Sequence, residues 1–361
     1  MKTYGLPYKG SKDKIAEKIC SLFPIKENFY DLFMGGGSIT HYQLLQNQYK
    51  NYYANDFNPL VVKAFDMAIH GKFKNETRWI SHEEFDKLKN VDPYVAFCFS
   101  FGNDLKSYAY GKDLEPYKKA LHYLVVFQDE SLMKEIFPNV DFSFIHKIKD
   151  MNKRRLKVQE FMKKNKLGYN TPLEGSVKTM NFLENKNQLE SLNSISDVRM
   201  ERIERFEKIN NINLRANELE NAERLIVLNR LHTNENLQSL LQLESCERLT
   251  SIERLSIYNK SYDEIEIKPN SVVYLDPPYK STNKYEISKD FDYEKFYSWC
   301  ERQTELCFIS EYSMPKDRFT CIAEIEHISI ICANENQSVI ERVFLPNHQV
   351  KDYKIPSLFD M

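Results

Sequence analysis

The chain has 361 residues, which is enough for a sizeable hydrophobic core with one or two inserted parts. Hydrophobic residues make up 42% and charged residues 28% of it, as in soluble globular proteins. The sequence contains no run of about 18 apolar residues, so we expect no membrane span. The formal net charge of −2 argues against a nucleic-acid binder unless basic residues are concentrated locally.

The cysteines and the N-terminus indicate a compartment. Seven cysteines are scattered without a CxxC spacing or a pairing pattern, and the first residues lack an apolar signal region. We therefore expect free thiols in a reducing cytoplasm and no bound metal.

The first predicted elements are a strand, a glycine turn and a helix. Residues 27–33 predict a short buried strand, and Gly35, Gly36 and Gly37 form the turn that follows it. Ser38 is the predicted N-cap of a helix that runs to about residue 46.

A second strand and helix follow at once. Residues 51–54 predict the strand, which ends at Asn55-Asp56, and Asn58 with Pro59 begins a helix to about residue 69. The order strand, glycine turn, helix, strand and acid is the opening of a doubly wound α/β domain.

The next stretch, residues 80–127, is predicted to be helical and is rich in aromatic residues. Within it, the segment 99–104 and the residues after it mix aromatic, amide and cationic groups, which suits contacts with phosphates and bases. We predict Asn103 and Lys106 as DNA contacts. A glycine-capped helix end with core aromatics is an equally good interpretation.

Basic residues gather between His146 and Lys166, where nine lysines and arginines stand against two acids. A local positive field attracts phosphates even in a chain of negative net charge, although a solvated helix face has the same composition. We predict Lys153, Arg154 and Arg155 as DNA contacts.

An internal repeat occupies residues 187–257, with apolar residues at every third position over much of it. A period of three drifts by about 60° per step around an α-helix, and it does not match strand alternation either. Short broken helices or a three-sided solenoid remain open, as do the roles of spacer and of recognition element.

The last third predicts further strands around one helix. Residues 271–275 form a buried strand, residues 291–304 a helix, and residues 306–309, 322–332 and 338–345 three late strands.

The loop Asp276-Pro277-Pro278-Tyr279 carries groups suited to an aromatic amine. The exocyclic amine of adenine is a poor nucleophile, because its lone pair is delocalised into the ring. A carboxylate and a backbone carbonyl that each accept one N–H draw the nitrogen toward sp³ geometry and aim it. Asp276 and the carbonyl of Pro277 supply these acceptors on a loop stiffened by two prolines, and Tyr279 can stack on an extruded base. The alternative is a proline-rich turn with an aspartate cap.

These segments together resemble the Dam-like, D12-class adenine-N6 DNA methyltransferases of the alpha group. Residues 6–12 resemble the N-terminal cofactor motif of that family, residues 31–38 its FxGxG motif, and residues 55–58 its ND-x-N motif. Residues 276–279 resemble its catalytic motif, and residues 261–263 a short acidic segment that precedes it. The turn is FMGGGS and not GxGxxG, which disfavours an NAD enzyme.

The resemblance implies S-adenosylmethionine as the cofactor, held over the glycine turn. Asp56, 19 residues after Gly37, has the spacing of an acid that accepts the two ribose hydroxyls. The implied catalytic residues are Asp276, Pro277, Pro278 and Tyr279. The implied cofactor residues are Tyr8, Lys12, Asp31, Phe33, Gly35, Gly36, Gly37, Asp56, Asp263 and Asp276.

The resemblance also implies an architecture and a partner. We expect a Rossmann-like α/β sheet with helices on both faces, a catalytic domain of residues 1–89 and 258–361, and an inserted, mainly helical target-recognition region of residues 90–257. The partner is duplex DNA, the protein a monomer, and the setting a bacterial or phage-infected bacterial cytoplasm. The C-terminal Ser357-Leu358-Phe359 weakly resembles the peptides that replication clamps bind.

Two rival functions stay open. An RNA adenine-N6 methyltransferase uses the same chemistry, and a non-catalytic DNA-binding protein can keep a degenerate methyltransferase fold. The sequence does not give the recognition site or say whether an endonuclease partner exists.

Overall fold

The computed structural model describes residues 3–112, 114–165, 167, 235–246, 252–279, 291–332 and 335–354. The chain divides into two compact units, Met1–Ala109 with Glu235–Met361, and Tyr110–Asn234. Among the described residues, no helix is both long enough and apolar enough to cross a bilayer. The predicted clamp-binding tail, Ser357-Leu358-Phe359, lies outside the described residues.

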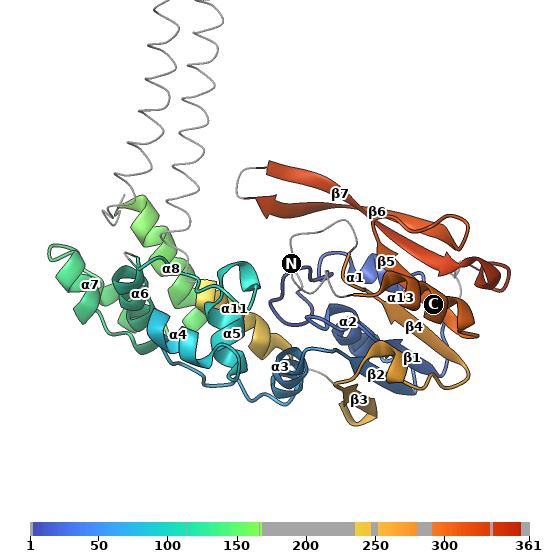
Figure 1. Cartoon of the computed structure of the whole chain (residues 1–361). Coiled ribbons are helices and arrows are strands. Elements are labelled where there is room, and N and C mark those ends of the chain that lie inside the picture. Colours follow the sequence, from blue (N-terminus) through green and yellow to red (C-terminus); the bar gives the residue numbers. More distant parts are fainter. Residues whose placement is uncertain are drawn as a thin grey trace, which may run out of the picture. The chain divides into compact units, whose positions relative to one another are not determined.

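A single sheet organises the described part of the first unit. Its strands are β1 (Asn28–Asp31), β2 (Asn51–Asn55), β3 (Leu255–Tyr258), β4 (Ser271–Leu275), β5 (Leu306–Glu311), β6 (Phe319–Cys332) and β7 (Glu335–Pro346). They lie in the order β3-β2-β1-β4-β5-β7-β6, parallel from β3 to β5 and antiparallel in β7 (Figure 1). The predicted Rossmann-like, mostly parallel sheet with a final antiparallel hairpin is confirmed.

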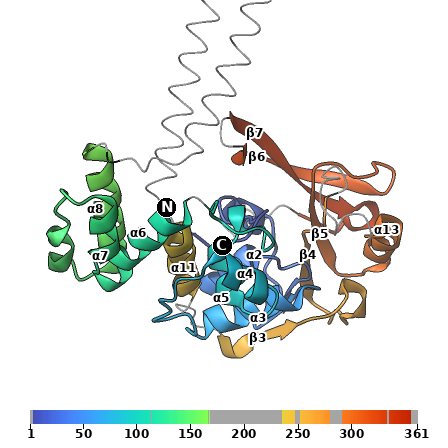
Figure 2. The same ribbon diagram turned by 60° about the vertical axis from the view of Figure 1, so that its left-hand side comes forward.

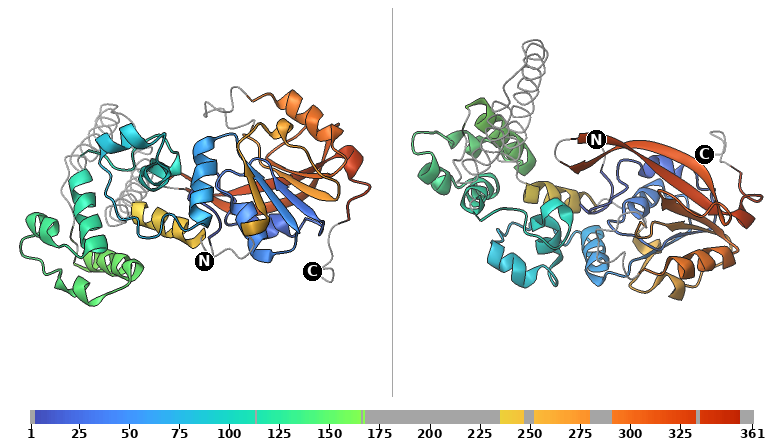
Figure 3. Two further views of the ribbon diagram at one scale, coloured as in Figure 1. Left: turned by 90° about the horizontal axis from the view of Figure 1, so that it is seen from below. Right: turned by 45° about the horizontal axis from the view of Figure 1, so that its top comes forward.

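Helices cover both faces of this sheet (Figure 3). Those next to the sheet are α1 (Ala16–Cys20), α2 (Ser38–Gln46), α3 (Pro59–Ile69) and α13 (Tyr293–Arg302). The first unit also contains α4 (His82–Leu88), α5 (Pro93–Phe99) and α11 (Glu235–Ser245). Of these, α5 and α11 pack on each other and on α3, and α4 packs on α5. On one face Tyr30 packs in a cluster with Phe296 and Trp299 of α13. On the other face Phe29 contacts Phe23, which follows α1. Alternate residues of β1 therefore serve the two layers, as strand geometry requires.

The long hairpin of β6 and β7 reaches past the end of β5 (Figure 2). Arg342 of β7 is paired with Glu311, the last residue of β5. Because the two strands are antiparallel, the residues of β7 that precede Arg342 lie beyond the carboxyl end of β5. They extend over the same edge of the sheet at which β1, β2 and β4 end.

One helix start differs from its prediction. Ser38 is the first residue of α2 and not its N-cap, which is Gly37 with a left-handed φ of 70°. The Ser38 hydroxyl instead donates to the carbonyl of Tyr4 at 3.0 Å and lies 2.7 Å from the Ser11 hydroxyl. The serine therefore fastens the N-terminal segment to the glycine turn.

In the described part of the leucine repeat, residues 235–245 form the α-helix α11, which agrees with the alternative of short helices. Leu237, Leu240, Leu243 and Cys246 are all fully buried. Four side chains at intervals of three sweep about half the circumference of a helix, so the spacing suits a helix that is enclosed on a broad face. The repeat then ends in the edge strand β3, which the sequence did not predict. Residues 187–234 and 247–251 of the repeat lie outside the described residues.

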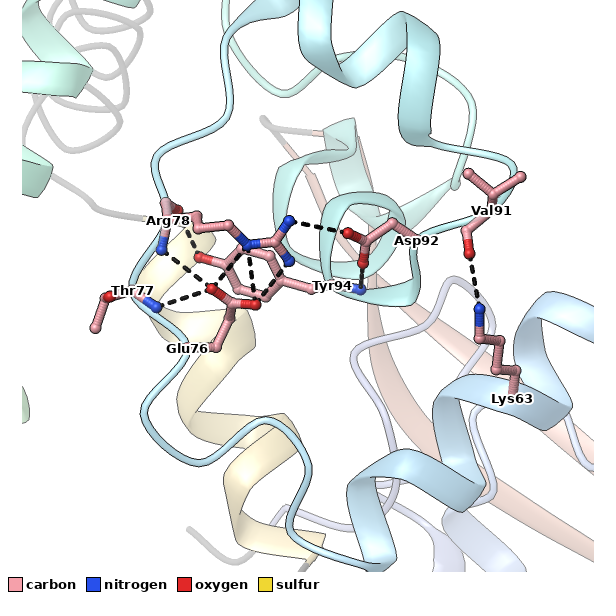
Figure 4. A network of polar contacts seen from close by, with 7 residues as sticks. All are labelled: Lys63, Glu76, Thr77, Arg78, Val91, Asp92 and Tyr94. Atoms are coloured by element: carbon pink, nitrogen blue, oxygen red, sulfur yellow. Dashed lines mark hydrogen bonds and ion pairs between the residues drawn. The ribbon is translucent and has the colours of Figure 1, made fainter.

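A polar network fixes the start of α5 (Figure 4). Arg78 donates to both carboxylate oxygens of Glu76 and, at 3.1 Å, to Asp92, whose other oxygen caps α5 at the Tyr94 amide. The hydroxyl of Tyr94 donates back to the carbonyl of Arg78 at 2.8 Å. The segment between α3 and α5 is thereby tied to the first turn of α5.

The described part of the second unit is helical, with α6 (Glu115–Phe127), α7 (Ser131–Ile136) and α8 (Met151–Lys164). Arg154 of α8 is only 8% exposed. Its guanidinium donates to the carbonyls of Val125 and Val126, at the end of α6, and to those of Ile148 and Lys149 before α8. The guanidinium thus supplies donors to two of the carbonyls that the C-terminal end of α6 leaves without helical partners, and to two more in the segment before α8.

Candidate active site

Three adjacent parallel strands each lead to a carboxylate. Asp31 is the last residue of β1, Asp56 follows β2 and Asp276 follows β4. Carboxyl ends of parallel strands meet at one edge of a sheet, where α/β proteins hold their ligands. Burial, followed by the charges of Asp276 and Asp56, raises the pKa of Asp31 to about 7, although the Thr40 hydroxyl opposes the rise. The edge is therefore electronegative.

The N-terminal segment packs directly on the glycine turn. The amide of Leu6 donates to the carbonyl of Gly36 at 2.6 Å. A Cβ on Gly36 would lie 2.8 Å from the Cβ of Tyr8 and 3.0 Å from the carbonyl oxygen of Leu6, so only glycine fits. The predicted cofactor motif and the predicted FxGxG motif are thus brought together.

The side chain of Tyr8 packs between the glycine turn and helix α5. Its ring stacks on Phe97 of α5 with centroids 6.1 Å apart. Burial raises the pKa of Tyr8 well above its usual range, and the charges of Asp56 and Asp276 add to the rise. The phenol therefore stays neutral, and α5, tied down by its capped first turn, helps to hold it.

Asp56 bonds to the turn that it follows. One of its carboxylate oxygens accepts from the amide of Gly35 and the other from the amide of Asn58, both at 2.8 Å. Burial raises its pKa, and these two backbone bonds oppose the rise. Each carboxylate oxygen has two lone pairs, so these bonds leave acceptor capacity for a diol.

Asp31 carries a buried oxygen to which no described residue donates a hydrogen bond. The Thr40 hydroxyl donates to its Oδ2 at 2.7 Å, whereas its Oδ1 has no hydrogen-bond partner among the described residues. Buried polar atoms are nearly always paired in native proteins, and an exception points to a ligand or a water.

Asp276 forms an ion pair with Lys12 across the sequence. The ammonium of Lys12 lies 3.0 Å from Oδ1 and 2.8 Å from Oδ2 of Asp276, and 4.0 Å from Oε1 of Glu341. Burial raises the pKa of Asp276, and although the charge of Lys12 opposes the rise, the charge of Glu341 adds to it, so the pKa lies above its usual value. Burial alone would lower the pKa of Lys12, but the two carboxylates outweigh it and raise that pKa. Lys12 is thus a cation held between two acids.

Tyr279 is oriented by the same group of side chains. Its hydroxyl donates to Glu341, its ring lies 4.9 Å from the Lys12 ammonium, and it meets the Tyr312 ring edge to face at 4.7 Å. The loop itself is anchored where the Tyr293 hydroxyl donates to the carbonyl of Pro278 at 2.9 Å. The loop of residues 276–279 is therefore fixed from both sides.

Glu341 is the site residue that the sequence analysis missed. It is 2% exposed and lies on β7 beyond the end of β5. Val343 and Leu345, two and four residues later, are fully buried and share its face of the strand. A single acid in an apolar alternating series was the signal that could have identified it.

Two other predicted cofactor residues have partners within the fold. Phe33 packs on Tyr262 and Phe296 in the aromatic cluster of the α13 face. Asp263 forms an ion pair with Lys295 at 2.6 Å, which lowers its pKa. Their roles in cofactor binding stay predictions.

The predicted DNA contacts differ in their surroundings. Lys106 and Lys153 are exposed, whereas the Asn103 amide donates to the Phe97 carbonyl and the Ser239 hydroxyl, and Arg155 donates to Asn152. Arg154 is buried with its guanidinium bonded to four carbonyls, which argues against its predicted phosphate contact.

The strand order and the glycine turn define the Rossmann-like methyltransferase class of α/β proteins. A model of the D12 class N6 adenine-specific DNA methyltransferase family matches residues 8–189, about half of the chain, and the chain belongs to that family. A search of curated proteins finds no match. The matched segment includes Tyr8, the glycine turn and Asp56 and ends before Asp276.

Proposed function

We propose that the chain transfers a methyl group from S-adenosylmethionine to the exocyclic amine of an adenine extruded from duplex DNA. The family supports adenine methylation in DNA. The observation that carries the finer proposal is the position of Asp276, at the carboxyl end of β4, beside the strand that leads to the glycine turn.

The residues at the strand ends fit this cofactor. S-adenosylmethionine is a cation with an ammonium, a ribose diol and an adenine, and it supplies an electrophilic methyl group on sulfur. Asp31 offers a buried acceptor that has no hydrogen-bond partner in the described part of the chain, and Asp56 offers a carboxylate at the turn. The close packing of Gly36 under Tyr8 makes a glycine cradle at the electropositive start of α2.

Asp276 and Pro277 would perform the polarisation. The carboxylate of Asp276 and the carbonyl of Pro277 accept the two N–H bonds of the amine, which localises its lone pair for in-line attack on the methyl carbon. A carboxylate must be ionised for this, and Lys12 opposes the burial that would protonate Asp276. The methylated nitrogen then loses its extra proton, which needs no dedicated base.

The remaining residues would handle the nucleic acid. Tyr279 provides a ring for stacking on the extruded base, and Lys106 and Lys153 provide exposed cations for the backbone. We propose residues 90–257 as the target-recognition region and residues 1–89 with 258–361 as the catalytic region, in a monomer.

The test is methyl incorporation by the purified full-length chain. Labelled S-adenosylmethionine is supplied with unmethylated duplex DNA or with folded RNA, and the products are digested and separated as nucleosides. We expect N6-methyldeoxyadenosine from DNA and stabilisation of the fold by the cofactor in a thermal shift assay. Labelling of RNA alone would replace the proposal by the RNA activity, and no binding or labelling would leave a non-catalytic protein.

A further inference from the structure

One ammonium group faces two carboxylates at the candidate active site. Lys12 contacts both oxygens of Asp276 within 3.0 Å, and Oε1 of Glu341 lies 4.0 Å from the same nitrogen. Lys12 and Glu341 are both shielded, with side chains 10% and 2% exposed. Charges in such surroundings are costly unless they are paired, so the arrangement of partners matters.

Asp276 cannot serve Lys12 and a target amine equally well. A cation that contacts both oxygens takes up acceptor positions that an amine donor also needs. It also withdraws electron density from the acceptor that has to polarise the amine. Entry of the base therefore requires Lys12 to leave Asp276, and an unpaired buried ammonium would make this step unfavourable.

We propose that Glu341 is the positioning residue that receives Lys12 when the target amine takes its place at Asp276. The displacement is short, because the Lys12 nitrogen is already within 4.0 Å of the second carboxylate. Lys12 therefore keeps a carboxylate partner when the base enters, and Asp276 accepts an N–H of the amine in place of the ammonium. This inference rests on the proposed methyl transfer.

The same carboxylate acts on Tyr279. The Tyr279 hydroxyl donates to Glu341, so the acid that receives Lys12 also orients the ring that stacks on the base. The chain thus brings an acid from β7, far from Asp276 in sequence, to act on two site residues at once. A purely structural acid would influence folding but not the exchange of Lys12 between partners.

A double-mutant cycle separates these two roles. Glu341→Gln keeps the shape and an acceptor for Tyr279 but removes the charge. We expect it to lower kcat/KM for methylation of DNA by about tenfold, because Lys12 stays with Asp276. In a Lys12→Met background the same change should cost less than about twofold. An equal loss in both backgrounds, or no loss in either, would overturn the proposal.

Binding of DNA supplies a readout without turnover. The duplex carries the recognition site, read from the methylated DNA of cells that express the protein, with either adenine or an abasic residue at the target. We expect Glu341→Gln to weaken binding to the adenine duplex by about tenfold and to leave the abasic duplex within about twofold, since no base then displaces Lys12. Equal weakening of both duplexes would contradict the exchange.

Two further variants guard the interpretation. Glu341→Asp keeps the charge with a shorter reach and should retain more activity than Glu341→Gln. If Glu341→Gln fails to fold, the double-mutant cycle is run with Glu341→Asp instead. Additive losses of Glu341→Asp and Lys12→Met would then contradict the proposal. Glu324→Gln on β6 removes an exposed ion pair with Arg342 and should leave activity unchanged. If the wild-type chain methylates no DNA, the proposed function fails; if it does and the cycle shows no coupling, only this inference fails.

Discussion

The sequence analysis predicts charged site residues in two regions, the strand ends of the first unit and helix α8 of the second. At the strand ends the charges converge: Lys12 and Asp276 are 264 residues apart in the chain and 2.8 Å apart in space. On α8 they diverge. Lys153 is exposed, while its neighbour Arg154 points inward and bonds to four carbonyls.

The difference shows what turns a cluster of charges into a candidate site. Neighbours in sequence on a helix point in different directions, so a basic run contains both surface and interior residues. Carboxyl ends of adjacent parallel strands, in contrast, must meet at one edge whatever the sequence between them. The sheet topology therefore supports the predicted site residues at the strand ends, whereas nothing comparable supports the predicted DNA contacts on α8.

The largest expected effect is at the strand ends. Asp276→Ala removes the acceptor that polarises the amine, and we expect methylation of DNA to fall by at least about a thousandfold. Stabilisation by S-adenosylmethionine in a thermal shift assay should persist, because Asp31, Asp56 and the glycine turn are intact. Asp352→Ala, at an exposed position of the same unit, is the control and should leave turnover unchanged. Near-normal turnover of Asp276→Ala would refute its assigned role.

Sequence patterns predicted most of the sheet and part of the site. Strands such as β4 are buried apolar runs closed by turn residues, and motif spacing brought out Asp56 and Asp276. Glu341 was missed because its role depends on the register between β7 and β5, which no local pattern gives. The repeat was left open between short helices and a solenoid because a helix buried on a broad face, such as α11, has no narrow apolar stripe.

The next effect concerns α8. Arg154→Ala leaves four carbonyls at the end of α6 and before α8 without their donor, and we expect a loss of about 3 kcal/mol in the stability of the second unit. Hydrogen exchange of peptides from residues 115–164 measures it locally. Arg155→Ala, which loses only its bonds to Asn152, should cost less than about 1 kcal/mol. Equal protection in both variants would show that Arg154 does not hold the helices together.

A third prediction uses the pH dependence of the buried strand-end acid. The pKa of Asp31 is about 7 in the folded chain, above its ordinary value of 3.8, so the folded state binds more protons than the unfolded state between these values. The stability of the fold therefore falls as the pH rises through this window, by about 2 kcal/mol between about pH 5.5 and about pH 7. Asp31→Asn cannot ionise and should remove this part of the fall in denaturant titrations at the two pH values. An identical slope in variant and wild type would contradict the raised pKa.

The smallest expected effect is at Lys153, the exposed neighbour of Arg154. If it contacts a phosphate, Lys153→Ala weakens binding to any duplex by only about twofold to threefold at moderate salt, because one contact contributes little. The sharper readout is the slope of log K against log salt concentration, which should become shallower by about one unit. Lys50→Ala removes the same charge from an exposed site on the first unit, where its partner is Glu27, and should leave the slope unchanged. A slope that is the same in wild type and Lys153→Ala would make Lys153 a solvated side chain, and α8 would then be a structural helix whose conspicuous basic residues serve its fold and its solubility.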